Sequence, residues 1–216
     1  MKRVIVIGEG QTEQEFCKDV LIPHFSHRNI FLQNPTIKHT GGGIIKWPLL
    51  KTQIENHLKQ DKTSLVTTLI DYYGIYDKHS FPGWAESKII VDKSTRLCFI
   101  EDAMKNDIDG GLRHRFIPYL QLHEFEGLLF TQISAFRNNF TSQEADINTI
   151  ENIVLNYPNP ELINDGTDTA PSKRLHKLIK GYNKVVYGAI LASEIGLPNI
   201  RAKCPRFNAW IETLEN

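Results

Sequence analysis

The stretch VIVIGEGQTEQEF, from Val4 to Phe16, decides the fold class. Its β-branched start is typical of a buried strand over residues 3–7, and the glycines after it predict a tight turn. Thr12, with Glu15 three residues later, predicts a capping box that begins a helix. A strand, a glycine turn and a helix in this order open an α/β unit.

Two nucleotide-binding motifs are excluded by single positions. A dinucleotide fingerprint that starts at Gly8 needs a glycine at position 13, where the sequence has Glu13. The glycines at positions 41–43 lack the lysine context of a phosphate-binding P-loop. We therefore expect neither a dinucleotide cofactor nor ATP hydrolysis by this chain alone.

Strands and helices alternate over the first two-thirds of the sequence. Further strands are predicted at 34–39, 64–70 and 115–122, and helices at 47–58, 90–104, 147–157, 172–179 and 182–195. Pro118 predicts an edge position or a bend in the third of these strands. The pattern predicts an α/β domain over residues 1–130, with a mainly parallel sheet flanked by helices, and a helical C-terminal extension over 131–216 packed on the same core.

Composition narrows the function classes. Lysine plus arginine and aspartate plus glutamate both number 25, so an anionic ligand needs a local basic patch. The three cysteines lie far apart and show no zinc or redox spacing, so we expect reduced core thiols. No leader sequence and no apolar run of about 18 residues is found, which favours a cytoplasmic protein without a membrane span.

Three predicted strands end in acidic residues. Glu9 follows the first strand, Asp71 follows the strand at 64–70, and Glu124 and Glu126 follow the last. Ligand sites of parallel sheets lie at the carboxyl ends of their strands, so these carboxylates should meet. Mg²⁺ or Mn²⁺ is the expected occupant, because hard cations prefer oxygen ligands.

Several motifs resemble known proteins. EGQTE at residues 9–13 looks like the first acidic motif of the Toprim fold, in which a glutamate and a later Asp-x-Asp organise Mg²⁺-dependent chemistry on nucleic-acid phosphodiesters. DYYG, HEFEGLLF, APSKRL and CPRFNAWIETL together resemble the bacterial family called domain of unknown function 4276, which is regarded as Toprim-like. The resemblance covers nearly the whole chain.

The resemblance implies roles for particular acids. Glu9 would be a general acid/base or metal ligand, and Asp71 a metal ligand. Our own choice for the third catalytic and metal-binding acid is Glu126. The second Toprim aspartate is replaced by Tyr73, so Asp77 or Glu126 would have to supply the missing carboxylate. We interpret Glu13 and Glu15 as capping residues instead.

Substrate-binding candidates surround these acids. Gly8 and Gly10 would let backbone and phosphate approach closely, and His123 lies beside the last acidic strand end. Six basic residues from Lys173 to Lys184 form a cluster whose side chains mostly belong on a solvated helix face. Lys173 and Arg174, at a helix start, are the two that suit a phosphate.

Three functions are compatible with the sequence. The first is a divalent-metal-dependent phosphodiesterase, a nuclease on DNA or RNA, with a role in phage defence. The second is a non-catalytic Toprim-like module that works with a partner ATPase, which the replacement at Tyr73 supports. The third is a small-nucleotide phosphohydrolase, which the neutral net charge favours over a strong DNA binder.

Overall fold

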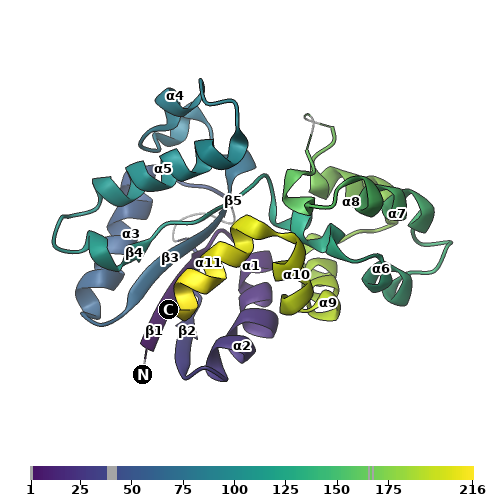
Figure 1. Cartoon of the computed structure of the whole chain (residues 1–216), viewed down its shortest axis with the longest axis horizontal. Coiled ribbons are helices and arrows are strands. Elements are labelled where there is room, and N and C mark those ends of the chain that lie inside the picture. The colour runs from purple at the N-terminus through teal and green to yellow at the C-terminus, as the bar shows by residue number, and fades with distance from the viewer. Residues whose placement is uncertain (1, 38–42, 165, 167) are drawn as a thin grey trace.

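The computed structural model describes residues 2–37, 43–164, 166 and 168–216 and contains a five-stranded sheet (Figure 1). The strands are β1 (Lys2–Gly8), β2 (Ile30–Gln33), β3 (Leu65–Asp71), β4 (Phe116–Ile117) and β5 (Leu120–Gln121). Their order is β2-β1-β3-β4, β5 also pairs with β3, and every pairing is parallel. The predicted α/β class with a parallel sheet is therefore confirmed.

Helices cover the sheet and make up most of the C-terminal third. The α-helices are α1 (Gln11–Phe16), α2 (Ile22–Ser26), α3 (Trp47–Gln60), α4 (Trp84–Ser87), α5 (Lys93–Asp107), α6 (Ile133–Asn139), α7 (Ile147–Asn156), α8 (Pro171–Leu178), α9 (Lys184–Ile195), α10 (Leu197–Lys203) and α11 (Pro205–Glu215). A π-helical turn, η1 (Cys17–Leu21), joins α1 to α2, and 3-10 helices form η2 (Tyr72–Gly74), η3 (Asp77–His79), η4 (Arg113–Arg115), η5 (Phe125–Thr131) and η6 (Pro160–Leu162). No helix among these is long and apolar enough to cross a membrane.

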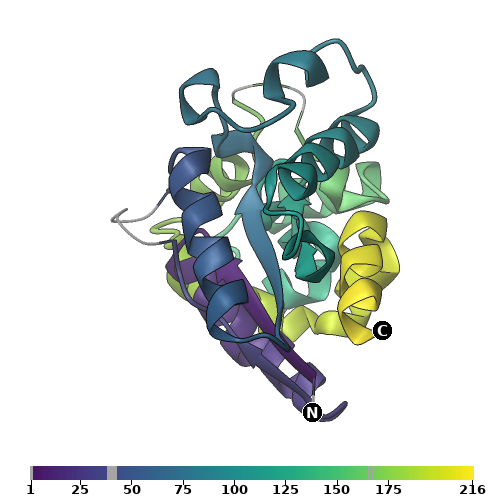
Figure 2. The same cartoon turned by 90° about the vertical axis from the view of Figure 1, so that its left-hand side faces the viewer.

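Each face of the sheet buries its own hydrophobic core. Successive side chains of a strand point to opposite faces, so Val4 and Val6 enter one core while Ile5 and Ile7 enter the other. The second core also contains residues of α3 and α5, and the first contains residues of α1, α9 and α11. Figure 2 shows these helix layers on the two sides of the strands.

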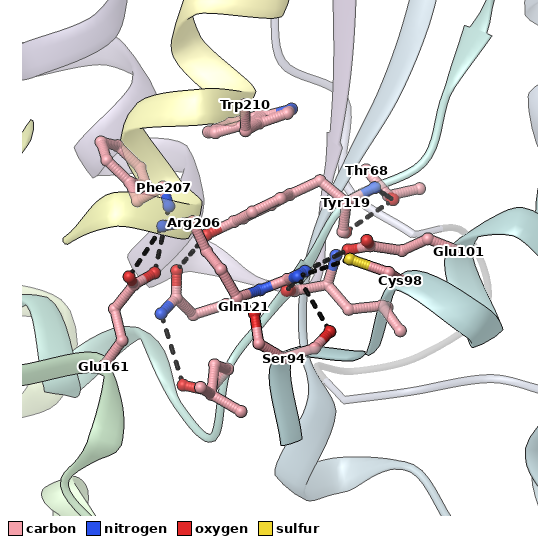
Figure 3. Close-up of polar contacts among 12 residues, drawn as sticks. Thr68, Ser94, Cys98, Glu101, Tyr119, Gln121, Glu161, Arg206, Phe207 and Trp210 are labelled. Atoms are coloured by element: carbon pink, nitrogen blue, oxygen red, sulfur yellow. Dashed lines mark hydrogen bonds and ion pairs between the residues drawn. The ribbon is translucent and has the colours of Figure 1, made fainter. Parts of the chain in front are cut away.

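The last helix closes the first core against the sheet. Trp210 of α11 stacks on Tyr119 with ring centroids 4.5 Å apart, and its indole N–H donates to Thr67 Oγ1 of β3 at 2.8 Å. Arg206 pairs with Glu101 of α5 at 2.7 Å and thus ties α11 to the other side of the sheet (Figure 3). The first core therefore continues across residue 130, and the domain division proposed there stays a prediction.

The start of the same helix is capped from a distant loop. Glu161 of η6 accepts hydrogen bonds from the backbone N–H groups of Arg206 and Phe207, at 2.9 and 3.0 Å (Figure 3). A carboxylate suits this position because the first N–H groups of a helix have no partner within it. The cap and the Arg206 ion pair together fix the C-terminal helix to two separate parts of the chain.

Several local predictions need correction. The strand expected at 34–39 is instead β2, at Ile30–Gln33. Of the expected residues, Thr36 makes one isolated bridge with Gly8. Residues 38 and 39, and residues 41 and 42 of the glycine run at 41–43, lie outside the described residues. The helix expected to begin at residue 90 begins at Lys93, after the Asp92 cap. The residues after the predicted strand at 115–122 form the 3-10 helix η5 (Phe125–Thr131), and no separate helices were predicted at α6, α10 and α11.

The bend predicted at Pro118 is confirmed, because the strand expected at 115–122 divides into β4 and β5. Thr68 bridges the break with its hydroxyl, which donates to Tyr119 O at 2.8 Å and accepts from Tyr119 N at 3.0 Å.

Among the cysteines, Cys17 and Cys204 are buried free thiols as predicted, but Cys98 is exposed, so it is not a core residue.

Candidate functional site

Parallel pairing of β1 with β3 brings the first two acidic strand ends together. The register places Gly8 opposite Leu69, and the backbone N–H of Glu9 donates to Leu69 O at 3.2 Å. The Glu9 side chain then reaches the end of β3, where its Oε2 accepts from the backbone N–H of Asp71 at 3.2 Å. Glu9 and Asp71, 62 residues apart in sequence, are thus joined directly.

The third acid joins the cluster through η5. The backbone N–H of Phe125 donates to Asp71 Oδ1 at 2.8 Å, which holds the start of η5 against the end of β3. Glu126 is the next residue, and its side chain is completely buried. Within the described part of the chain, neither of its carboxylate oxygens accepts a hydrogen bond. Such a group is costly to bury unless a cation compensates for it.

Glu13 belongs to this cluster although we had interpreted it only as a capping residue. It does cap α1, but from Gly10: the Gly10 N–H donates to Glu13 Oε2 at 2.7 Å. The predicted Thr12–Glu15 capping box is therefore wrong, because the helix begins two residues earlier than it requires. Glu13 is buried, and its charge acts on both Glu9 and Asp71. The E-x-x-x-E spacing from residue 9 to residue 13 was the available signal.

Mutual repulsion and burial shift the titration of these acids. Burial and the neighbouring Glu13 charge raise the pKa of Glu9 from its usual 4.5 to about 7. Burial, followed by the charge of Glu9, raises the pKa of Asp71 well above its usual range. The pKa of Glu126 is also raised by burial, although Lys184 counteracts part of the effect. The cluster thus holds more negative charge than its surroundings neutralise.

Lys184 supplies a positive charge next to the carboxylate of Glu126. It begins α9, whose N-terminus is capped by the Asn183 side chain, and its Nζ lies 3.4 Å from Glu126 Oε1. Burial opposes its charge, but Glu126, Asp71 and the other acids outweigh that effect and raise the pKa of Lys184. Its ammonium is therefore firmly charged, and its side chain, 44% exposed as expected for this cluster, also reaches the buried Glu126 carboxylate.

An open pocket of about 600 Å³ lies over these groups. Its lining includes Glu9, Gly10, Glu13 and Lys184. Gly10 therefore borders the pocket, as a residue close to substrate must. Gly8 has another role, because a Cβ there would lie 3.1 Å from Glu13 Cβ and 3.2 Å from the Asn34 side chain. Its missing side chain lets α1 pack closely on the end of β1.

His123 lies beside the acids but is occupied by other contacts. It is buried, has a left-handed backbone (φ 66°), and its carbonyl accepts from the Tyr73 N–H at 2.9 Å. Its ring nitrogens lie 3.2 Å from Lys93 Nζ and 3.4 Å from Asn164 Nδ2. The backbone of Tyr73 thus connects the ends of β3 and β5.

The other predicted site residues make contacts of their own. Asp77 is exposed, pairs with Lys88 and accepts from the Trp84 indole. Lys173 is exposed and lies 3.7 Å from Asp168, whereas Arg174 Nε donates to Thr169 O at 2.7 Å. The structure therefore brings Glu9, Asp71 and Glu126 together and does not add these three residues to them.

Glu124 is a capping residue, because its carboxylate accepts from both the N–H and the hydroxyl of Ser172 at the start of α8, each at 2.9 Å.

In the described residues, no three histidine, cysteine, aspartate or glutamate side chains form a ready-made metal cage. Carboxylate oxygens are nevertheless the donors that Mg²⁺ prefers, and Mg²⁺ is often held by one or two of them with water and substrate phosphate. Glu9 and Asp71 provide two such groups beside an open pocket.

Fold and site together define an α/β domain with a carboxylate cluster at the carboxyl edge of a parallel sheet. The chain belongs to the family described as Domain of unknown function (DUF4276), whose model matches residues 8–215. Among solved structures it is similar to the C-terminal region of the Burkholderia pseudomallei OLD protein, with 15% sequence identity, coverage of 99% of this chain and 98% of that one, and a TM-score of 0.42. The comparison with curated proteins finds no significant match.

Proposed function

We propose that this protein is a divalent-metal-dependent phosphodiesterase, and specifically a nuclease on DNA or RNA. The observation that carries the proposal is the cluster of buried carboxyl groups: Glu9 lines the open pocket, Asp71 and Glu126 lie beside it in the protein, and burial raises the pKa of each. A divalent cation would favour the ionised form of these acids and offset their repulsion. The role in phage defence implied by the family resemblance belongs to this proposal too.

Glu9 and Asp71 are the residues that would hold Mg²⁺ or Mn²⁺, with Glu126 behind them. Two carboxylates suffice when water and a substrate phosphate complete the shell, so the donor set fits an open site. When bound, the metal would lower the pKa of a water molecule and neutralise charge that develops on the phosphate.

The chain's own groups can move the proton and orient the substrate. The ionised carboxylate of Glu9, which lines the pocket, can accept a proton from an attacking water. Lys184 lines the same pocket and can pair with a phosphate oxygen, while Glu126 fixes the position of its ammonium group. Hydrolysis by water requires no covalent nucleophile from the chain.

One observation favours a second candidate, the non-catalytic module that binds a partner ATPase. Tyr73 stands where the resemblance to the Toprim motif places an aspartate, and Lys184 already provides one positive charge next to Glu126. In that case the cluster would be a structural ion pair, and no metal would be needed. The third candidate, a small-nucleotide phosphohydrolase, would use the same acids for catalysis. Its binding to DNA should be weak and should not depend on salt concentration.

The experiment that tests the proposal is calorimetric titration with Mn²⁺ and Mg²⁺, followed by cleavage assays on labelled single- and double-stranded DNA and RNA. Glu9→Gln and Asp71→Asn should lose both metal binding and cleavage while remaining folded. Glu15→Gln is the matched control, because Glu15 lies on the same helix but is exposed and pairs with Lys18. Wild-type protein that binds no metal even with substrate present would refute the nuclease and favour the partner-binding module.

A further inference from the structure

The segment between β3 and α5 carries an exposed aromatic surface that the proposed chemistry does not use. It follows Asp71 directly and contains η2, η3 and α4. Four of its residues, which we call the aromatic–lysine surface, line a hollow of about 540 Å³ together with Asp77: Tyr76, Lys78, Trp84 and Lys88. In Figure 1 this segment lies near the end of the sheet where β3 finishes.

The surface lies close to the carboxylate cluster. Gly74 is packed so tightly that a Cβ there would lie 4.0 Å from Glu9 Oε1 and 3.0 Å from the Ile44 side chain. Tyr76 follows only two residues later, and an extended chain advances about 3.3 Å per residue. The aromatic–lysine surface therefore begins two residues beyond a glycine that packs near the Glu9 carboxylate.

The aromatic rings are held in place by the protein itself. The Trp84 indole donates to Asp77 Oδ1 at 2.6 Å, and its ring centroid lies 5.5 Å from that of Tyr72. The Tyr76 backbone N–H donates to His79 Nδ1 at 3.0 Å. Rigid aromatic groups lose little conformational entropy on binding, so such a surface is prepared for stacking.

The whole segment is also anchored to α5. Gly83 has a left-handed backbone (φ 72°), and a Cβ there would lie 2.9 Å from Ala103 Cβ and 3.1 Å from the Phe99 ring. Arg96 of α5 donates to the carbonyl of Ile90 at 2.6 Å. The segment is therefore fixed on the rigid part of the fold.

Its chemistry matches that of an unpaired nucleic-acid strand. Tyr76 leaves 53% of its surface exposed, and Lys78 Nζ lies 5.7 Å from its ring centroid. Lys88 adds a second ammonium group, and the Asp77 charge is already paired with it. Aromatic rings stack on bases while lysines contact phosphates, which is how proteins hold single strands without reading their sequence.

We propose that the aromatic–lysine surface binds single-stranded nucleic acid whose backbone continues into the Glu9 pocket. The inference rests on the proposed function for the direction of the strand, and it specifies the substrate as an unpaired polymer. It distinguishes this protein from a small-nucleotide hydrolase, which would need no second surface. Ile89 and Val91, 86% and 90% exposed in the same segment, would suit a protein partner instead, so the test must separate the two.

The test is fluorescence anisotropy of a labelled oligothymidine of about 16 nucleotides at low salt in EDTA, where no cleavage occurs. Tyr76→Ala should weaken binding about 5- to 150-fold, the effect of losing one base–aromatic stack. Lys78→Ala should reduce the slope of log affinity against log salt by about 0.7. The matched control is Phe31→Ala, because Phe31 is an exposed aromatic on β2 with Arg3 5.9 Å from its ring centroid.

Catalysis and strand binding can fail separately. Glu9→Gln should abolish cleavage and still bind the oligonucleotide, so a protein that never cleaves but shows Tyr76-dependent binding retains this inference. Equal binding by wild type, Tyr76→Ala and Phe31→Ala would overturn it, even if the protein proves to be a nuclease. Absence of any oligonucleotide binding would overturn it too and would point to a protein partner at this segment.

Discussion

Replacing Glu9 by glutamine should make the metal-free protein more stable at alkaline pH. Burial and the charge of Glu13 raise the pKa of Glu9 from 4.5 to about 7, so the folded protein binds more protons than the unfolded chain between these pH values. The free energy of unfolding must therefore fall as pH rises through this window. The shift corresponds to about 3 kcal/mol, all of it lost above pH 7.

Glutamine removes the charge but keeps an oxygen that can accept from the Asp71 N–H. We expect Glu9→Gln to exceed wild type by about 2–3 kcal/mol at pH 8 and to match it more closely at pH 5. In a protein of this size, each kcal/mol changes the melting temperature by about 2–4 °C. Urea denaturation in EDTA from pH 5 to pH 8 measures the effect, and the exposed Glu15→Gln should show no such gain.

A divalent cation should reverse the ranking. A metal at about 1,000 times its dissociation constant stabilises wild type by about 4.1 kcal/mol, which exceeds the advantage of about 2–3 kcal/mol of Glu9→Gln, and the variant should gain nothing from it. Because the Glu9 proton must leave before the metal binds, Mn²⁺ affinity should fall about tenfold per pH unit below pH 7. Wild-type stability that does not change between pH 5 and pH 8, or a Glu9→Gln variant no more stable than wild type at pH 8, would refute the reasoning.

Three further changes test the surroundings of the cluster. Lys184→Gln should destabilise the protein by about 1–3 kcal/mol in urea denaturation, because Glu126 loses its nearby cation; no loss would mean that the carboxyl is already neutral. Arg206→Met should cost about 3–5 kcal/mol by the same measurement, since Glu101 would remain buried without its partner, and Glu101→Gln combined with it should recover part of the loss. Asp77→Asn should leave Mn²⁺ affinity unchanged in calorimetry, and a tenfold loss would place Asp77 in the metal site.

The sheet was predictable where its strands are long and apolar. β1 contains the apolar run VIVI and β3 is rich in apolar and β-branched residues, and both strands are buried along most of their length, as parallel strands covered on both faces are. β2 was misplaced because it has only four residues, of which Ile30 and Leu32 are buried and the others are exposed. The break between β4 and β5 could be expected from Pro118, but the Thr68 hydroxyl that spans it could not, since it comes from another strand.

In the candidate site too, residues could be predicted from the local sequence pattern, but contacts between distant segments could not. Glu9, Asp71 and Glu126 follow strand ends, so the topology of a parallel sheet was enough to group them. Lys184 gave no such signal, because a lysine at a helix start usually faces water and nothing in the local pattern indicates a carboxylate 58 residues earlier. Contacts across such separations depend on how α9 packs on η5, which is a property of the assembled core.

The turn after β1 explains why this cluster retains its excess charge. Glu13 packs so close to Gly8 that a Cβ added at Gly8 would lie 3.1 Å from Glu13 Cβ. The Gly10 N–H holds the Glu13 carboxylate by donating to its Oε2 at 2.7 Å. The cap that starts α1 therefore holds a second carboxylate next to Glu9. The cap and the part of the Glu9 pKa rise that exceeds the effect of burial both depend on Glu13, so a Glu13→Gln change should retain the cap while lowering the Glu9 pKa. That combination would separate the capping role of Glu13 from its electrostatic role.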